Sequence, residues 1–170
     1  MPLPPDANQF LNVIEDNKGI IYKVANAYCI DRENRKDLIQ EIIIQLWLAF
    51  PRYDQQFRLT TWIYRIALNV SISFYRKQAS RARLNQPLTD DIISFITVAD
   101  VQPDVDTELS MLNTFIRELK ELDRALILLY LEERSQQEIS EILGITISNV
   151  STKVSRIKEQ LKQKFITSKS

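Results

Sequence analysis

A row of short polar side chains, joined by cations, lies near the C-terminal end of the sequence. The row consists of Thr146, Ser148, Asn149, Ser151, Thr152, Lys153, Ser155, Arg156 and Lys158. On one helix, short hydroxyl and amide groups can reach base edges in a DNA major groove, while cations meet phosphates. An ordinary helical hairpin with a polar solvent face would show the same row, so the row alone leaves both interpretations open.

A second mixed face lies in the first half of the chain. Its residues follow at steps of three, four, four and three: Trp62, Arg65, Asn69, Ser73 and Arg76. Aromatic surfaces for stacking and cations for phosphates are what unpaired bases require. The alternative is an amphipathic helix whose long side chains snorkel around a partly buried tryptophan.

Catalytic and metal chemistry have few candidate residues. The sequence has no histidine, which is the commonest general base and metal ligand. Its single cysteine, Cys29, lies in an apolar helical pattern, cannot form an intrachain disulfide and is expected to be a buried hydrophobe. With two glycines, Gly19 and Gly144, a glycine-rich phosphate loop is excluded. We expect neither an enzyme nor a cofactor or metal site.

Charge is unevenly distributed along a chain whose formal net charge is zero. Residues 58–83 hold six cations and no acid, residues 84–106 five aspartates and no cation, and residues 145–170 six cations and one acid. Two basic surfaces separated by an acidic segment favour a nucleic-acid partner. No signal peptide or membrane-spanning run is visible, so we expect a cytoplasmic protein without membrane insertion.

The C-terminal row needs a helix-turn-helix to present it. Ser135 with Glu138 forms a capping-box pattern, Gly144 can end that helix, and Thr146 can cap the next. The expected buried stripe of the second helix is Ile147, Val150, Val154, Ile157 and Leu161.

The N-terminal half predicts three helices. The first runs from about residue 6 to 29, with a possible interruption at 17–19, and the second, capped by Asp31, covers about 32–49. The second helix has a wide apolar face and a narrow polar one, which is either solvent surface or a docking stripe: Asp37, Gln40, Glu41 and Gln45. After Pro51 and a loop over 52–60, the third helix covers about 61–81. Its expected core stripe is Ile63, Ile66, Ala67, Val70 and Phe74.

The sparse glycine and this periodicity predict an all-α fold of two small helical domains, 1–83 and 106–170. Residues 84–105 read as an acidic linker, although the apolar run 91–98 could pack. In the second domain we expect a helix over about 106–121 with Leu109 inward. A short helix capped by Asp123 follows through Leu131.

Three stretches in this order resemble bacterial RNA polymerase sigma factors of the extracytoplasmic-function (ECF) type. DLIQE at 37–41 resembles the family segment that grips the polymerase clamp helices, and TTWIYRIALNV at 60–70 resembles the signature on the helix that meets the −10 element. Residues 132–161 resemble the domain that reads the −35 element. Two departures are Ser151, where many relatives have a cation, and Leu59, where the usual residue is Phe.

The resemblance implies roles for these residues. The docking stripe would bind the clamp helices of the β′ subunit, the β flap would be a further contact on the polymerase core, and an anti-sigma factor is a possible partner. The loop before the third helix would capture a flipped base, with the strand path continuing along that helix: Tyr53, Asp54, Gln55, Gln56, Phe57, Arg58, Trp62, Arg65, Asn69 and Arg76. In the −35 reader, Ser148, Asn149, Ser151 and Thr152 would meet base edges, and Lys153, Arg156 and Lys158 would meet phosphates.

Two other classes of function compete with this one. A stand-alone helix-turn-helix regulator would bind duplex DNA, but it needs neither DLIQE nor the helix that carries Trp62. A purely protein-binding helical module would not need two basic surfaces.

Overall fold

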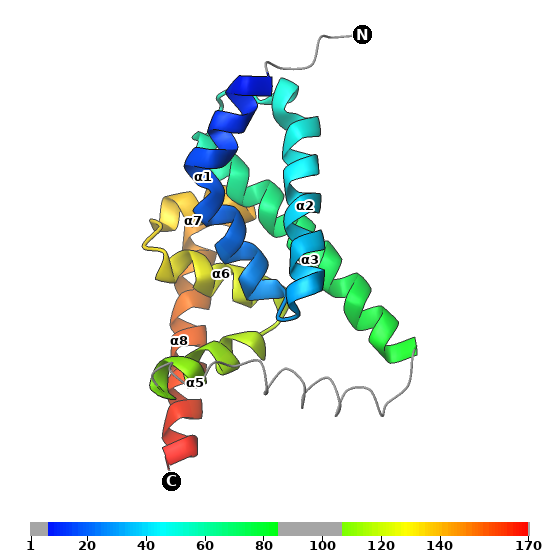
Figure 1. Ribbon diagram of the computed structural model, residues 1–170. Helices are drawn as coiled ribbons and strands as arrows, with labels where there is room; N and C mark the ends of the chain where they lie inside the picture. Colours follow the sequence, from blue (N-terminus) through cyan, green and yellow to red (C-terminus); the bar gives the residue numbers. More distant parts are fainter. Residues whose placement is uncertain (1–6, 85–106, 170) are drawn as a thin grey trace. The chain divides into compact units, whose positions relative to one another are not determined.

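The computed structural model describes residues 7–84 and 107–169, and every regular element in these ranges is helical (Figure 1). The all-α prediction is therefore confirmed. The chain divides into two compact units, residues 1–81 and 82–170. The expected linker lies outside the described residues except for Leu84, so the domain limits stay a prediction. No helix in the described ranges is both long and apolar enough to cross a membrane.

In the first unit, α1 (Ala7–Tyr28) and α2 (Arg32–Ala49) form a helical hairpin (Figure 1). Asp31 caps α2 as predicted, because its carboxylate accepts a hydrogen bond from the Asn34 backbone nitrogen at 3.3 Å. The possible interruption at 17–19 was wrong. The Asn17 amide donates to the Val13 carbonyl at 2.8 Å and Lys18 pairs with Glu15 at 2.7 Å, so local partners support a continuous α1.

Aromatic rings join the open end of the hairpin. Phe10 of α1 meets the ring of Trp47 edge-on at 5.0 Å and that of Phe50 at 5.4 Å. Phe50 belongs to the short 3₁₀ helix η1 (Phe50–Arg52), which ends α2 at the predicted proline. These ring contacts hold the open end of the hairpin in position for the loop that follows it.

Elsewhere on α2, Leu38 and Leu46 are fully buried, as the wide apolar face predicted.

The third helix, α3 (Leu59–Leu84), buries a different stripe from the one expected. Ile63 and Ala67 are buried as predicted, and Tyr64, Leu68 and Ser71 join them. Ile66, Val70 and Phe74, expected inside, are only half-buried. The error arose because α3 is apolar on two adjacent faces and the periodicity could not show which one packs against the hairpin.

The second unit is built around α8 (Ile147–Lys169), which packs against α5 (Thr107–Arg117), α6 (Glu121–Leu131) and α7 (Gln136–Leu143). Phe115 of α5 meets Phe165 of α8 edge-on at 5.0 Å, and Glu118 pairs with Lys164 beside them. The C-terminal turns of α8 are thus fastened to the start of the unit.

Two predictions for α5 and α6 were wrong. Lys120, not Asp123, occupies the N-cap of α6. Asp123 lies in the first turn, where the interaction of its negative charge with the helix dipole stabilises the helix. The buried Arg124 guanidinium donates to the carbonyls of Arg117 and, at 3.3 Å, Leu119, so it satisfies the end of α5. Leu109, expected inward, is 51% exposed.

The helix-turn-helix caps are present as predicted. The Ser135 hydroxyl accepts from the Glu138 nitrogen, and the Thr146 hydroxyl accepts from the Asn149 nitrogen, each at 3.1 Å. Gly144 takes the left-handed conformation, φ +70°, that ends α7. Ile147, expected in the buried stripe, is 44% exposed because it stands in the first turn of α8, ahead of the packed residues.

Candidate functional site

The loop between η1 and α3 is closed by its own hydrogen bonds. The Tyr53 hydroxyl donates to the Phe57 carbonyl at 2.8 Å, and the Asp54 carboxylate accepts from the Gln56 backbone nitrogen at 3.0 Å. Between these residues, Gln55 has φ +63°, a left-handed conformation that is unusual for a residue other than glycine. Such strained residues gather at binding sites, which makes this loop the first candidate.

A depression of about 560 Å³ opens between this loop and α1. Its apolar lining is half-buried: Val13, Phe50, Tyr53, Phe57 and Leu59. Its exposed polar lining is Gln9, Gln55, Gln56 and Arg58. The sequence had indicated the loop but not the wall from α1, since no pattern linked Gln9 and Val13 to residues so far along the chain. We call this depression the loop pocket.

The first turns of α3 lie against the same loop. The ring of Trp62 is 5.1 Å from that of Tyr53 and 6.3 Å from that of Phe50. The Arg65 guanidinium lies over the Phe57 ring at 5.1 Å. Trp62 is half-buried, as the alternative interpretation had expected, but it supports the loop and is not simply part of the core.

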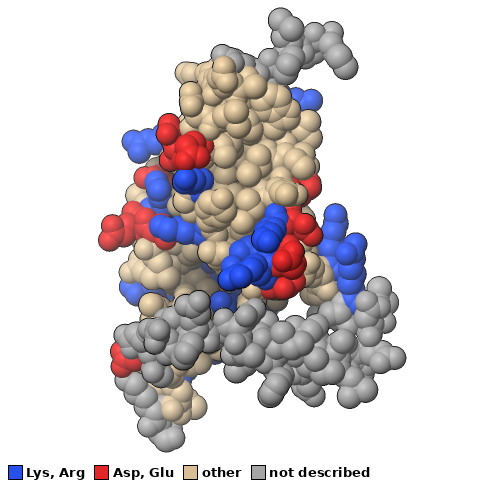
Figure 2. Space-filling view, in the orientation of Figure 1, with Lys and Arg blue, Asp and Glu red and all other residues tan. Residues whose placement is uncertain are grey.

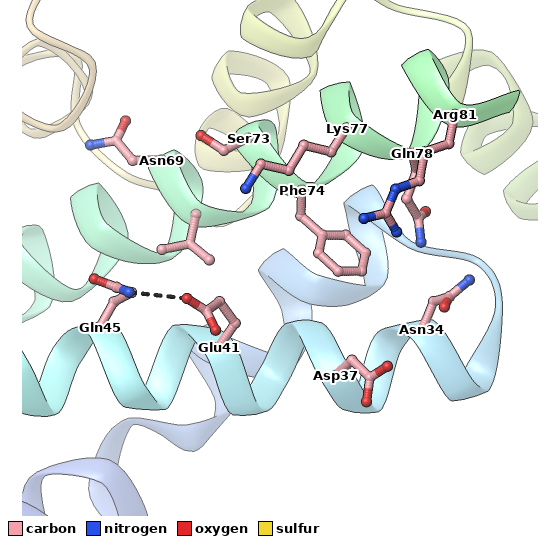
Figure 3. Close-up of a pocket in the computed structure, with 11 residues that line it drawn as sticks. Asn34, Asp37, Glu41, Gln45, Asn69, Ser73, Phe74, Lys77, Gln78 and Arg81 are labelled. Atoms are coloured by element: carbon pink, nitrogen blue, oxygen red, sulfur yellow. Dashed lines mark hydrogen bonds between the residues drawn. The ribbon is translucent and has the colours of Figure 1, made fainter. Parts of the chain in front are cut away.

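A second hollow of about 630 Å³ separates α2 from α3, and we call it the α2–α3 groove (Figure 3). Asp37, Glu41 and Gln45 stand along its α2 wall, where the Gln45 amide donates to Glu41 at 3.0 Å. Val70 and Phe74 supply its apolar part, and Figure 3 shows Phe74 pointing toward α2. The α3 wall is otherwise polar: Asn69, Ser73, Lys77, Gln78 and Arg81.

The groove divides the predicted sets of residues. Gln40 is exposed on α2 but does not line the groove, unlike the other three residues of its stripe. Asn69 faces the groove, whereas Trp62 and Arg65 contact the loop. Arg76 is exposed on α3 outside both hollows. The half-buried Phe74 was missed as a surface residue because an aromatic at helical spacing usually indicates core.

On α8, most of the predicted row is exposed, and Lys153 alone among its members is half-buried. The Thr152 hydroxyl donates to the Ser148 carbonyl at 3.0 Å, which leaves its oxygen free to accept. Lys158 is already engaged, because its ammonium donates to the Tyr130 hydroxyl of α6 at 3.0 Å. The exposed Ile147 adds an apolar group at the start of this row that the sequence analysis had placed in the core.

Two family models match the chain: Sigma-70 region 2 over residues 13–81 and Sigma-70, region 4 over residues 109–161. The RNA polymerase sigma factor YlaC of Bacillus subtilis is 30% identical over 146 residues, covering 81% of this chain and 80% of the relative. The chain belongs to the ECF sigma factors of the sigma-70 family. The chain is also 27% identical to the ECF RNA polymerase sigma factor SigW of the same organism over 169 residues. That alignment covers 94% of this chain and 90% of SigW.

Solved structures share the fold of this sigma factor. CnrH in complex with the cytosolic domain of CnrY has a TM-score of 0.69 at 17% identity, with 95% of this chain and 90% of that chain covered. The sigma factor RpoE in complex with the anti-sigma factor NepR from Bartonella quintana has a TM-score of 0.62 at 18% identity, covering 92% and 93%.

Family membership defines the function at a coarse level. The sigma factor binds RNA polymerase and directs it to promoters in transcription initiation. Sigma factors as a family are non-enzymatic regulators.

Proposed function

We propose that three surfaces divide the work of this sigma factor in initiation. The α2–α3 groove binds the clamp helices of polymerase, the loop pocket captures a flipped base of the −10 strand, and α8 reads the −35 duplex. The protein makes no covalent bond itself. Polymerase supplies the catalysis, and this subunit supplies promoter choice and strand capture.

The observation that carries strand capture is the closed loop beside a cluster of aromatic rings in contact with one another. Extruding a base costs a few kcal/mol, and stacking on an aromatic side chain returns about 1–3 kcal/mol per base. Tyr53 and Phe57 offer rings at the pocket, and the Tyr53–Phe57 hydrogen bond keeps both in one loop shape. The loop can therefore hold a base without ATP. Trp62 and Arg65 brace this loop. The strand path would continue along α3 at Arg76 and at Asn69, although Asn69 also lines the α2–α3 groove.

Polymerase docking is supported by the composition of the groove. Carboxylates on α2 face cations on α3 across an apolar part that includes Phe74 (Figure 3). A partner helix that carries cations, carboxylates and one apolar ridge would match the carboxylates, the cations and the apolar part of the groove. Gln40, outside the groove, would meet the neighbouring surface of the same partner. The second unit would contact the β flap, and an anti-sigma factor would compete for one of these surfaces.

The −35 reader is supported by its exposed polar row. Thr146, Ser148, Asn149, Ser151, Thr152 and Ser155 offer the short polar groups for base edges, while Lys153, Arg156 and Lys158 offer cations for phosphates. Ile147 can contact a thymine methyl group, which is the apolar mark of the major groove.

Permanganate reactivity of the −10 thymines tests strand capture in the reconstituted holoenzyme. Phe57→Ala should lower thymine reactivity by about tenfold, corresponding to one lost stacking contact, while recruitment to the closed promoter stays normal. Equal reactivity of the wild type and the Phe57 variant would contradict the assignment.

A separate pull-down of core polymerase tests the groove. Glu41→Lys should weaken capture, because it reverses a charge on the α2 wall. Glu33→Lys makes the same change on α2 outside the groove, and it should leave capture unchanged. Circular dichroism of both variants would verify that the helices remain intact.

A further inference from the structure

The wall that α1 contributes to the loop pocket has no role in the account above. Gln9 and Val13 lie one helical turn apart on α1, and both line the pocket. The other described lining residues belong to the segment 50–59. Val13 is half-buried with the apolar lining, whereas Gln9 is exposed at the polar rim. Gln9 therefore brings a hydrogen-bonding group to the pocket from outside the loop.

The surroundings of Gln9 are unusually poor in charge. Residues 7–14 of α1 and 42–49 of α2 contain no Lys, Arg, Asp or Glu. In Figure 2 the end of the first unit that these segments form is largely free of charged side chains. Among the described residues that line the pocket, Arg58 is the one that carries a charge. An occupant held by such a site is a neutral group rather than a run of phosphates.

The polar rim has the chemistry for reading a base edge. A glutamine amide carries an acceptor and two donors, so it can pair with a donor and an acceptor that lie side by side on a base. Gln55 and Gln56 carry the same group, but they sit in the loop that shapes the pocket and one of them is conformationally strained. Gln9 projects from a regular helix, so its side chain can change without reshaping the loop.

We propose that Gln9 is a specificity-determining residue, which contacts the edge of the captured base and sets which base the pocket accepts. This inference rests on the proposed capture of a base in the loop pocket. In it, the aromatic residues hold whichever base enters, and the amide of Gln9 discriminates among bases.

The test measures promoter opening by holoenzyme reconstituted with the full-length protein. Templates carry each of the four bases in turn at every non-template position of the −10 element. Gln9→Ala should flatten the ranking of bases at one position by about 5- to 10-fold, the lower part of the range for a bidentate base contact because the residue is exposed. Rankings at the other positions should not change.

Gln9→Glu provides a positive signature. A carboxylate only accepts hydrogen bonds, so the preference should move toward bases that present donors, guanine foremost, and away from thymine. Asn12→Ala is the matched control, since it removes an exposed amide from α1 that does not line the pocket. It should leave every ranking unchanged.

The two proposals fail in different ways. If Phe57→Ala impairs opening while Gln9→Ala keeps the wild-type ranking at every position, the role of Gln9 is overturned and base capture stands. If Phe57→Ala opens promoters normally, base capture itself is overturned and the role of Gln9 falls with it. A change of ranking in both Gln9 variants, together with impaired opening by Phe57→Ala, supports both.

Discussion

The ammonium group of Lys158 rests on Tyr130, to whose hydroxyl it donates at 3.0 Å while lying 5.0 Å from the ring centroid. This contact joins α8 to α6 within the second unit, and Lys158 belongs to the row that is proposed to read the −35 duplex. A lysine held in this way is less available to a phosphate than its neighbour Arg156, which is also exposed.

The two cations should therefore differ in the salt dependence of promoter binding. Each phosphate contact contributes about 0.9 to the slope of log K against log salt. Arg156→Ala should lower the slope of the holoenzyme by about that amount, and Lys158→Ala should lower it by less. Binding titrations over a range of salt concentrations measure both. Equal losses would show that Lys158 leaves Tyr130 when DNA binds.

The two glycines should respond oppositely to alanine. Gly144→Ala places a side chain at φ +70°, and because no atom lies within 4 Å of the added carbon, the loss is purely conformational. It should destabilise the second unit by about 1 kcal/mol. Gly19→Ala, within α1 and equally unobstructed, should stabilise the first unit by about 0.5–1 kcal/mol. Thermal denaturation of each variant shows whether its melting temperature rises or falls. Shifts of both melting temperatures in the same direction would contradict the argument.

Strain in the loop predicts a variant that gains stability and loses function. Gln55→Gly relieves the left-handed conformation at φ +63°, and the net gain should be about 0.5–1 kcal/mol. Removing the amide and loosening the loop should nevertheless slow promoter opening. Glu133→Gly relieves φ +60° in the turn before α7, so it should give a similar stability with normal opening. Denaturant titration and permanganate footprinting separate the two effects.

The buried Cys29 predicts a pH effect. Burial, together with the Asp31 carboxylate, raises the pKa of this thiol. Because the folded-state pKa lies above that of the unfolded chain, the stabilising contribution is complete below the ordinary thiol pKa of about 8.5 and is lost as the pH rises from there through the raised folded-state pKa. The free energy of unfolding of the wild type should therefore fall more steeply there than that of Cys29→Ala. Parallel curves would show that the thiol does not ionise on unfolding in that range.

Local patterns in the sequence were enough for the helices and their caps. The bounds of α2, the caps at Asp31, Ser135 and Thr146, and the turn at Gly144 follow from short-range chemistry, which acts over three or four residues. Errors arose where one helix offers two apolar faces. Which face of α3 packs depends on α1 and α2, so the exposure of Phe74 could not be read from periodicity.

The candidate site was predictable only in part for the same reason. The loop over 53–58 is contiguous, so its residue types and the family resemblance indicated it. The opposite wall of the pocket, at Gln9 and Val13, depends on tertiary packing of Phe10 against Trp47 and Phe50. The contact between Lys158 and Tyr130 of another helix likewise could not be predicted from local patterns.

The Tyr53–Phe57 hydrogen bond has a consequence for timing. The loop is already closed by its own hydrogen bonds in the absence of DNA, so under the proposed capture no slow folding of the loop would stand between encounter and capture. The slow step would then be the opening of a base pair in the DNA and the rotation of one base out of the duplex. Promoters with a weakly paired base at that position would open faster, and the kinetics of initiation would be encoded in the duplex rather than in the protein.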